Sequence, residues 1–343
     1  MDLTTTEGVI REAEAIFASE GRDLRSSLYR ELLLNALKCK RDELDFLDLK
    51  VLNRAVSEFR YAAKVFKPYR NVRKVSIFGS ARTAPGTPYY ELAVELGQLL
   101  AERGYMVITG AASGIMRAGI EGAGLEKSFG VNILLPFETE PSGAIRDDPK
   151  LIRFRYFFTR KLFFVMEADA FALFPGGFGT HDEGFEVLTL LQTGKAPPMP
   201  LLLMELPDEE YWETWHGFIE GQLLKRGYIS PEDLSLYKIV HSADEGADWI
   251  SFYYSTFHSL RQVGDTLVIR LTQPLGSVQV KELNKAFHDL LQAGEITKTT
   301  PLPAEEDEPE LLSLPRIRFT NNKRSPGRLN QMILAINKLG REG

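Results

Sequence analysis

The stretch FPGGFGTHDE at residues 174–183 places three glycines, a threonine and two carboxylates within ten residues. Glycines let a ligand approach the backbone closely, and the free N–H groups at the first turn of a helix attract anions. The hydroxyl of Thr180 can add one further hydrogen bond. This composition predicts a phosphate site along residues 175–180, with Thr180 opening a helix.

The carboxylates of the same stretch allow two interpretations. Thr180 and Glu183 fit the capping-box pattern, in which the glutamate folds back onto the N–H of the threonine and only stabilises the helix. Alternatively, Glu183 faces a bound ligand and takes part in chemistry. A tight strand-to-helix turn without any ligand is the simplest alternative, and the spacing alone leaves these interpretations open.

Two familiar phosphate-binding templates do not fit this turn. A dinucleotide fingerprint needs a third glycine after Gly177 and Gly179, but Thr180, His181 and Asp182 follow. A P-loop needs lysine after the glycine at 184, where Phe185 stands. Both templates therefore fail, and the phosphate interpretation depends on the glycines and the helix start alone.

The surrounding elements predict an α/β fold. Short apolar strands alternate with amphipathic helices from about residue 72 onward, a pattern typical of a parallel sheet covered on both faces. Ligands of such sheets bind beyond the carboxyl ends of the strands, where the turns at 110–114 and 175–179 are expected. We expect a Rossmann-like, doubly wound parallel sheet.

Three segments follow from this pattern. Residues 1–70 read as a helical extension, residues 71–260 as the α/β domain, and residues 261–343 as a small α+β appendage. The last helix of the α/β domain is expected over residues 243–258. The acidic segment AEEDEPE at 304–310 is most simply a solvated loop.

Composition narrows the function classes. The chain has 343 residues, a formal net charge of −6 and one cysteine, so a general nucleic-acid or membrane-surface protein is not expected and no internal disulfide can form. The N-terminus is acidic and amphipathic, unlike a secretory signal, and no apolar run has the length of a membrane span. The expected location is cytoplasmic.

Several motifs together resemble one known family. PGGFGTHDE is similar to the Pro-Gly-Gly-x-Gly-Thr-x-x-Glu signature of the LOG ("Lonely Guy") nucleotide phosphoribohydrolases, whose members are often labelled lysine decarboxylases. FFTRKLFF at 157–164 resembles the Arg-Lys element of the family, and SIFGSAR at 76–82 its first strand and turn. ITGAASGIMRAGIEGAG at 108–124 resembles its second glycine-rich turn. The similarity covers residues 72–245, and the flanks resemble the longer bacterial members in layout.

The resemblance implies an enzyme that hydrolyses the N-glycosidic bond of a nucleoside 5′-monophosphate, such as AMP or a cytokinin riboside monophosphate, to a free base and ribose 5-phosphate. It assigns Arg160 and Glu183 as the catalytic pair. It implies no metal and no pyridoxal phosphate, and a homodimer or larger homo-oligomer. The residues it implies for phosphate and nucleotide binding are Gly79, Ser80, Gly110, Ser113, Gly114, Lys161, Pro175, Gly176, Gly177, Gly179 and Thr180.

The implied chemistry is physically coherent. Cleavage of the glycosidic bond develops positive charge on the ribose, and a carboxylate beside it stabilises the transition state more than the ground state. Glu183 can also orient or deprotonate the attacking water. Arg160 stays cationic and suits binding of phosphate or ribose oxygens.

Two departures from the family pattern keep a second function open. The turn Gly110-Ala111-Ala112-Ser113-Gly114 carries two methyl groups where many members have glycine, and Arg117 replaces an acid. His181 stands where apolar residues are more usual, and it is a candidate for ligand contact or proton transfer. The alternative is a non-catalytic carrier or sensor of a nucleotide or molybdenum cofactor. Amino-acid decarboxylation has no independent signal in the sequence.

Overall fold

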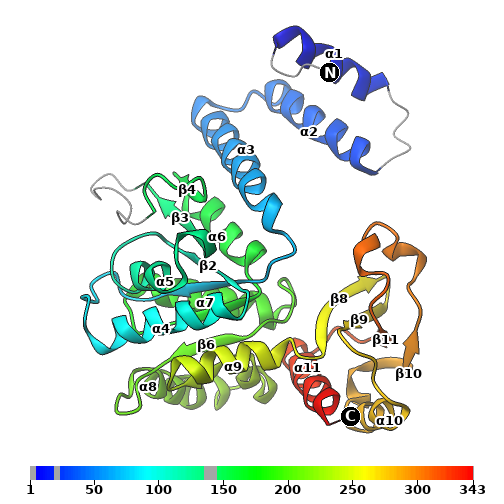
Figure 1. Cartoon of the computed structure of the whole chain (residues 1–343). Coiled ribbons are helices and arrows are strands. Elements are labelled where there is room, and N and C mark those ends of the chain that lie inside the picture. Colours follow the sequence, from blue (N-terminus) through cyan, green and yellow to red (C-terminus); the bar gives the residue numbers. More distant parts are fainter. Residues whose placement is uncertain (1–4, 19–23, 135–144, 343) are drawn as a thin grey trace. The chain divides into compact units, whose positions relative to one another are not determined.

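The computed structural model describes residues 5–18, 24–134 and 145–342. They form two compact units, Met1–Tyr61 and Ala62–Gly343. Helices α1 (Thr6–Ala18) and α2 (Leu24–Arg41) lie in the first unit, and helix α3 (Phe46–Phe66) continues from the first unit into the second (Figure 1). No helix in the described ranges combines the length and apolar character that crossing a membrane requires.

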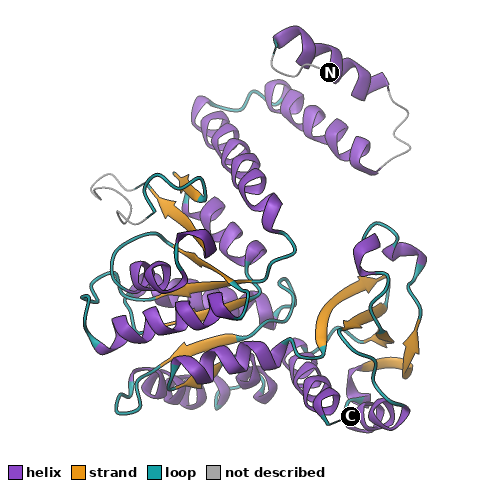
Figure 2. Ribbon diagram, in the orientation of Figure 1, coloured by secondary structure: helices purple, strands orange, loops and turns teal. Residues whose placement is uncertain are grey.

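A seven-stranded sheet forms the centre of the second unit, and all its strand pairs are parallel. The strand order is β4-β3-β2-β1-β5-β6-β7. This confirms the expected Rossmann-like α/β fold (Figure 2). The strands are β1 (Lys74–Phe78), β2 (Met106–Thr109), β3 (Ser128–Ile133), β4 (Leu151–Phe154), β5 (Ala170–Leu173), β6 (Leu201–Met204) and β7 (Lys238–Val240).

Alternating apolar side chains give this sheet two buried faces. Val75 and Ile77 of β1 pack in one core, and Phe78 packs in the other. Helices α4 (Pro88–Glu102), α5 (Ile115–Ala123) and α9 (Ala243–Tyr253) contribute to the first core. The end of α3 contributes to the second, together with α6 (Phe157–Glu167), α7 (Phe178–Gln192) and α8 (Tyr211–Phe218). The uninterrupted apolar strands of the sequence reflect this double coverage.

The strand order reverses between β1 and β5, because the chain builds outward from β1 through β2, β3 and β4 before it returns to β5. A switch of this kind leaves a crevice beyond the carboxyl ends of the two central strands, where ligands of such folds bind. The turns after Phe78 and Leu173 meet at this place.

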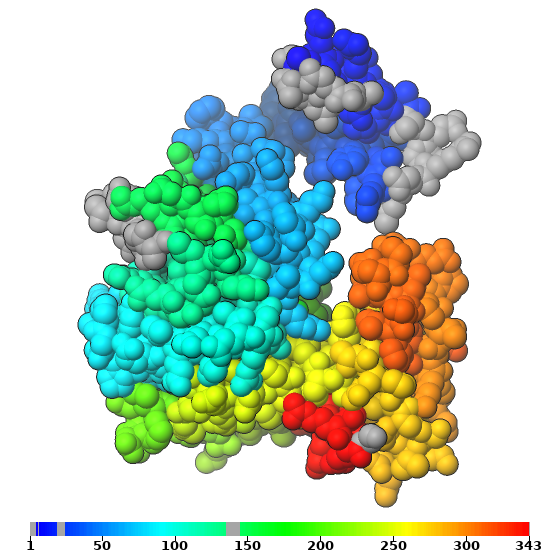
Figure 3. Space-filling model, viewed as in Figure 1, coloured from blue at the N-terminus to red at the C-terminus, as the bar shows by residue number. Residues whose placement is uncertain are grey.

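The C-terminal residues form a second sheet with its own core. Strands β8 (Phe257–Val263), β9 (Thr266–Leu271), β10 (Leu291–Thr299) and β11 (Arg316–Asn321) pair in the antiparallel order β10-β11-β9-β8. Helices α10 (Ser277–Ala286) and α11 (Pro326–Arg341) pack on it. The strand residues form a lobe coloured yellow to orange in Figure 3.

One expected helix boundary is wrong. Helix α9 ends at Tyr253 instead of continuing to residue 258, and β8 begins at Phe257. Asn337 of α11 explains the change, because its Oδ1 accepts hydrogen bonds from the backbone N–H groups of Thr256 and Phe257 at 3.0 and 2.8 Å. The sequence pattern predicted a helix through this point, but hydrogen bonds to a residue about eighty positions away hold the backbone in another conformation.

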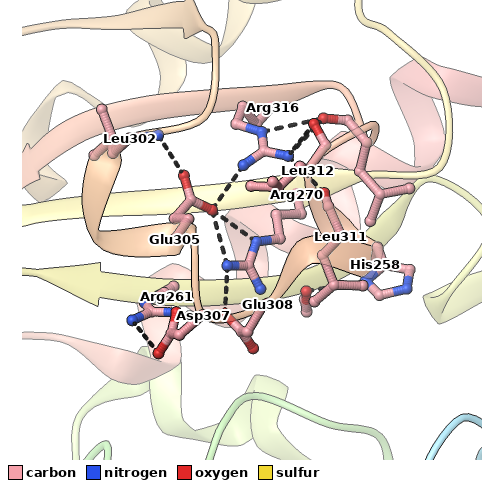
Figure 4. Close-up of polar contacts among 12 residues, drawn as sticks. His258, Arg261, Arg270, Leu302, Glu305, Asp307, Glu308, Leu311, Leu312 and Arg316 are labelled. Carbon is pink, nitrogen blue, oxygen red and sulfur yellow. Dashed lines mark hydrogen bonds and ion pairs between the residues drawn. The ribbon is translucent and has the colours of Figure 1, made fainter. Parts of the chain in front are cut away.

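The expectation of a solvated loop at 304–310 is also wrong for Glu305, whose side chain is 0% exposed. The antiparallel register places Arg270 of β9 directly opposite Arg316 of β11. Glu305 Oε1 lies 2.9 Å from Arg270 Nε and 2.7 Å from Arg316 Nη1, so one carboxylate pairs with two buried cations (Figure 4). Glu308 Oε2 supplies a second negative charge 2.7 Å from Arg270 Nη2. Buried charges are tolerated only when they are paired in this way.

Candidate functional site

A cavity of about 730 Å³ lies beyond the carboxyl ends of β1 and β5. Its wall is built by the turn after β1, the start of α6 and the first turns of α7. The predicted site residues among its lining are Gly79, Ser80, Arg160, Gly176, Gly177, Gly179, Thr180 and Glu183. The place is the one expected for a ligand of this fold.

Three of the predicted residues outside this lining, Pro175, Ser113 and Gly114, connect the turns at the edge of the cavity. Ser80 N donates to Pro175 O at 3.1 Å, and Ser113 Oγ donates to Ala81 O at 2.9 Å. Gly114 has φ +66°, and a Cβ there would lie 2.2 Å from Ser80 O. Three turns are thereby joined by one backbone hydrogen bond, one hydroxyl-to-carbonyl hydrogen bond and the close approach of Gly114 to Ser80, which only glycine permits.

The phosphate turn differs from the expectation in where its helix begins. Helix α7 starts at Phe178 with Gly177 as N-cap, so Thr180 is not the capping residue. The N–H of Thr180 already donates to Gly177 O at 3.0 Å. The N–H groups of Phe178 and Gly179 lie at the very start of the helix, where no carbonyl of the same helix can accept from them. Free N–H groups at a helix start are suited to bind an anion, and these two lie within the predicted range 175–180, although the helix begins before Thr180.

The glycines of this turn serve two different purposes. A Cβ on Gly176 would lie 2.1 Å from Thr180 Oγ1, so this glycine lets the turn fold back onto the helix. A Cβ on Gly177 or Gly179 would meet nothing within 4 Å. Both residues line the cavity, so the space beside them is available to a ligand.

Glu183 is not the partner of a capping box. The helix begins five residues earlier, and its N-terminus has no side-chain cap. The carboxylate is only 5% exposed and lines the cavity. Burial raises its pKa from 4.5 to about 7; Lys161 and Arg160 lower it, and Glu186 and Asp182 raise it. A carboxyl group that lines a cavity and has a pKa close to neutral pH is typical of a catalytic group.

Arg160 approaches the same cavity from α6 and is 9% exposed. Its Nε donates to Val131 O at 2.9 Å, which fixes the plane of the guanidinium. The ring of Phe164 lies 5.1 Å from its Cζ. A Cβ on Gly110 would lie 2.6 Å from Nη2 of Arg160, so Gly110 acts by making room for this cation.

Lys161 belongs to α6, its side chain reaches α7, and it is not part of the cavity lining. Its Nζ is 2.8 Å from Asp182 Oδ2 and 2.6 Å from Glu186 Oε2. Burial lowers the pKa of Lys161, but the hydrogen bonds to these two carboxylates outweigh it, and the pKa lies above its usual value. Lys161 therefore has two carboxylate partners and lies outside the residues that line the cavity.

Several residues that line the cavity were not identified as site residues from the sequence. Arg82, Met116, Phe157 and Phe178 belong to the wall, and Arg82 carries a further cation near the turns. Arg117 is not part of that wall, and its Nε pairs with Glu121 Oε1 at 2.7 Å. The motif SIFGSAR contained the signal for Arg82, since its arginine follows the first glycine-bearing turn.

His181 lines the cavity, and its Nε2 lies 2.7 Å from the hydroxyl of Tyr211. Burial lowers the pKa of His181. Tyr211 begins α8, thirty residues later in the chain, and no spacing rule connects it with the signature. Among the residues described, no group of three or more His, Cys, Asp or Glu side chains could hold a metal ion.

Known proteins resemble this chain over the same region. Residues 109–250 match the family model described as "Possible lysine decarboxylase". A probable cytokinin riboside 5′-monophosphate phosphoribohydrolase of Oryza sativa subsp. japonica is 30% identical over 167 residues, which are 46% of this chain and 63% of that protein. The chain thus spans less than two thirds of this relative. A cytokinin riboside 5′-monophosphate phosphoribohydrolase of Rhodococcoides fascians is 29% identical over 161 residues, 46% of this chain and 79% of that protein.

A solved structure with a related fold is the molybdenum cofactor binding protein of Rippkaea orientalis. It has 20% sequence identity and a TM-score of 0.37, covering 52% of this chain and 94% of that chain. A likeness of this size bears on neither substrate nor activity.

Proposed function

We propose that the α/β domain of this chain is a LOG-family enzyme that hydrolyses the N-glycosidic bond of a nucleoside 5′-monophosphate to a free base and ribose 5-phosphate, as the matched family model and the phosphoribohydrolase relatives support. The observation that carries this proposal is the position of Glu183. A buried carboxylate with a pKa of about 7 shares one cavity with a helix N-terminus suited to phosphate.

The 5′-phosphate binds at the start of α7 in this proposal. The N–H groups of Phe178 and Gly179 and the positive end of the helix dipole attract the anion. The open space beside Gly177 and Gly179 lets phosphate oxygens come close to the backbone. The Thr180 hydroxyl lines the same cavity and can donate one more hydrogen bond.

Glu183 lies one and a half turns farther along the same helix, so a phosphate at the helix start brings the attached ribose toward the carboxylate. As the glycosidic bond breaks, positive charge grows on the sugar and is attracted by the ionised carboxylate. With a pKa of about 7, Glu183 can also take a proton from the attacking water. The oxygen of that water forms the new bond to the anomeric carbon, and the base leaves with the electrons of the broken C–N bond. The departing base takes up the proton that Glu183 removed from the water, which returns Glu183 to its ionised form.

Arg160 supplies the matching positive charge. Its guanidinium stays ionised and is fixed by the bond to Val131 O, so it can hold ribose or phosphate oxygens in place. It also helps to keep the pKa of Glu183 from rising further.

The substrate class is a nucleoside 5′-monophosphate, with cytokinin riboside monophosphates, the substrates in the names of the relatives, and AMP as the first candidates. Apolar side chains of Met116, Phe157 and Phe178 line the wall and suit the face of a planar base. Arg117, one of the departures from the family pattern, is paired with Glu121 outside this wall and leaves the cavity unobstructed.

A panel of purine, pyrimidine and N6-modified adenine 5′-monophosphates tests this function. We expect equal amounts of free base and ribose 5-phosphate, detected by chromatography, from at least one nucleotide. Thermal stabilisation by a nucleotide without product would instead favour a carrier or sensor. If every nucleotide of the panel stays intact and none raises the melting temperature of the protein, the proposal is wrong.

We also propose that a second copy of this chain covers the exposed face beside the cavity. Phe178 is 97% exposed, and Phe157, Phe158, Leu162 and Met166 of α6 are each about half exposed. Apolar groups gathered in this way mark interaction surfaces. Light scattering should give at least twice the mass of 38.7 kDa, and replacement of Phe158 and Leu162 by glutamate should lower it.

A further inference from the structure

The hydroxyl of Tyr211 connects the phosphate turn with His181. Its oxygen lies 2.6 Å from Gly176 O, 3.4 Å from Gly176 N and 2.7 Å from His181 Nε2. One atom at the start of α8 therefore contacts both the turn before α7 and the first turn of α7 itself.

These contacts determine the proton positions. A tyrosine hydroxyl has one hydrogen, and a carbonyl oxygen can only accept, so the O–H of Tyr211 donates to Gly176 O. The oxygen of Tyr211 must then accept from His181, which requires a hydrogen on Nε2. Since burial lowers the pKa of His181, the neutral ring predominates, and its Nδ1 carries no hydrogen.

Buried contacts hold Tyr211 in this position. Glu205, at the end of β6, is 0% exposed, and its carboxylate accepts from the backbone N–H groups of Trp212 and Glu213. This fixes the first turn of α8. The indole of Trp212 also packs against the imidazole of His181, with 5.7 Å between the ring centroids.

The bond to Gly176 O also determines the direction of the next N–H group. Gly176 O and Gly177 N belong to one peptide, which is planar and trans. The N–H of Gly177 therefore points away from Tyr211. Because a Cβ on Gly177 meets only open space at the cavity, a ligand can reach this part of the backbone.

We propose that Tyr211 is a positioning residue of the phosphate site: it orients the peptide between Gly176 and Gly177 as a donor to the anion and holds His181 in the Nε2–H tautomer at the cavity wall. The role toward phosphate rests on the proposed function. The tautomer is a property of the free protein and does not depend on that function.

Binding measurements test the first part. Tyr211→Phe is introduced together with Glu183→Gln, so that no ligand is consumed, and AMP, ribose 5-phosphate and adenosine are titrated by calorimetry. We expect about tenfold weaker binding of the two phosphate-bearing ligands, the size of one lost hydrogen bond, and unchanged binding of adenosine. Equal losses for all three ligands, or no loss, would overturn this part.

Tyr237→Phe is the matched control. The hydroxyl of Tyr237 also pairs with a histidine, His216 Nδ1 at 2.7 Å, in the same group of aromatic side chains, but it does not line the cavity. This variant should bind all three ligands like the parent protein. A loss of phosphate affinity here as large as that of Tyr211→Phe would show a general structural effect and contradict the assigned role.

Nitrogen-15 NMR of the histidine rings tests the second part without any substrate. We expect His181, assigned by comparison with His181→Leu, to show a protonated Nε2 and a bare Nδ1 in the wild type and in Tyr237→Phe. In Tyr211→Phe both tautomers of His181 should be populated. A protonated Nδ1 in the wild type, or an identical spectrum in Tyr211→Phe, would overturn the tautomer assignment.

The two proposals can fail separately. If no nucleotide binds at all, the proposed function fails, but the NMR measurement still decides the role of Tyr211 toward His181.

Discussion

Lys161 Nζ lies 2.6 Å from Glu186 Oε2, and this ion pair ties α6 to α7 beside the cavity. Arg160 directly precedes Lys161, and Glu183 lies about one turn before Glu186. The pair thus joins the two helices close to the residues that we assign to catalysis. It also keeps a positive charge near Glu183 without using space in the cavity.

The ionisation of Glu183 should govern the rate. Because burial raises its pKa to about 7, and the ionised form is the one that stabilises positive charge on the ribose, kcat/KM should rise with pH and level off above neutrality. A pH–rate profile between pH 5 and 9 measures this. Nucleotide binding to Glu183→Gln over the same range corrects for titration of the substrate phosphate. A corrected profile that is flat would contradict the role of the carboxylate.

Two neighbouring charges should move this profile in opposite directions. Lys161→Met removes a cation that lowers the pKa of Glu183, so the rising part should shift to higher pH. Glu186→Gln removes an anion that raises this pKa, so the rising part should shift to lower pH. Lys195→Met, at an exposed lysine outside the cavity lining, should leave the profile in place. Shifts of the same sign in the first two variants would contradict the electrostatic explanation.

Stability should depend on the charge of Glu183 with a definite sign. The folded-state pKa of about 7 lies above the ordinary value of 4.5, so the stabilisation from the neutral carboxyl is complete below pH 4.5 and is lost as the pH rises through 7. Glu183→Gln should therefore increase the free energy of unfolding at pH 8, by up to about 3 kcal/mol, and by much less at pH 5. Urea denaturation at both pH values measures the difference, with the exposed Glu282→Gln as control. An equal effect at both pH values would refute the raised pKa.

The two adjacent glycines of the phosphate turn should respond differently to alanine. Gly176→Ala places a Cβ 2.1 Å from Thr180 Oγ1 and should destabilise the fold by about 1–3 kcal/mol, the usual cost of forced overpacking. Gly177→Ala meets no atom within 4 Å, so the melting temperature should stay unchanged while nucleotide affinity falls. Calorimetric melting and nucleotide titration separate the two effects. Unchanged affinity in Gly177→Ala would place the phosphate elsewhere.

Local sequence patterns were sufficient to predict the parallel sheet and the glycine-rich turn at 175–180. Apolar strands that alternate with amphipathic helices predict a sheet covered on both faces, and a glycine-rich turn before a helix predicts an anion site wherever it occurs. The start of α7 was placed three residues late, because threonine is the usual cap and Gly177 takes that position instead.

Contacts between distant residues were beyond sequence reasoning. Tyr211 reaches Gly176 only because α8 follows β6 on the face where α7 lies. Glu305 is buried because strand register places Arg270 opposite Arg316, which a local acidic composition does not reveal. The end of α9 depends on Asn337 in the same way.

Product release by wild-type protein and by Glu183→Gln tests the central assignment most directly. Each protein is incubated with the nucleotide that is cleaved fastest, and free base and ribose 5-phosphate are quantified. The wild type should release both in equal amounts, and Glu183→Gln should release less than about a hundredth as much while the same nucleotide still raises its melting temperature. Equal release by both proteins would show that the carboxylate of Glu183 does not perform the chemistry.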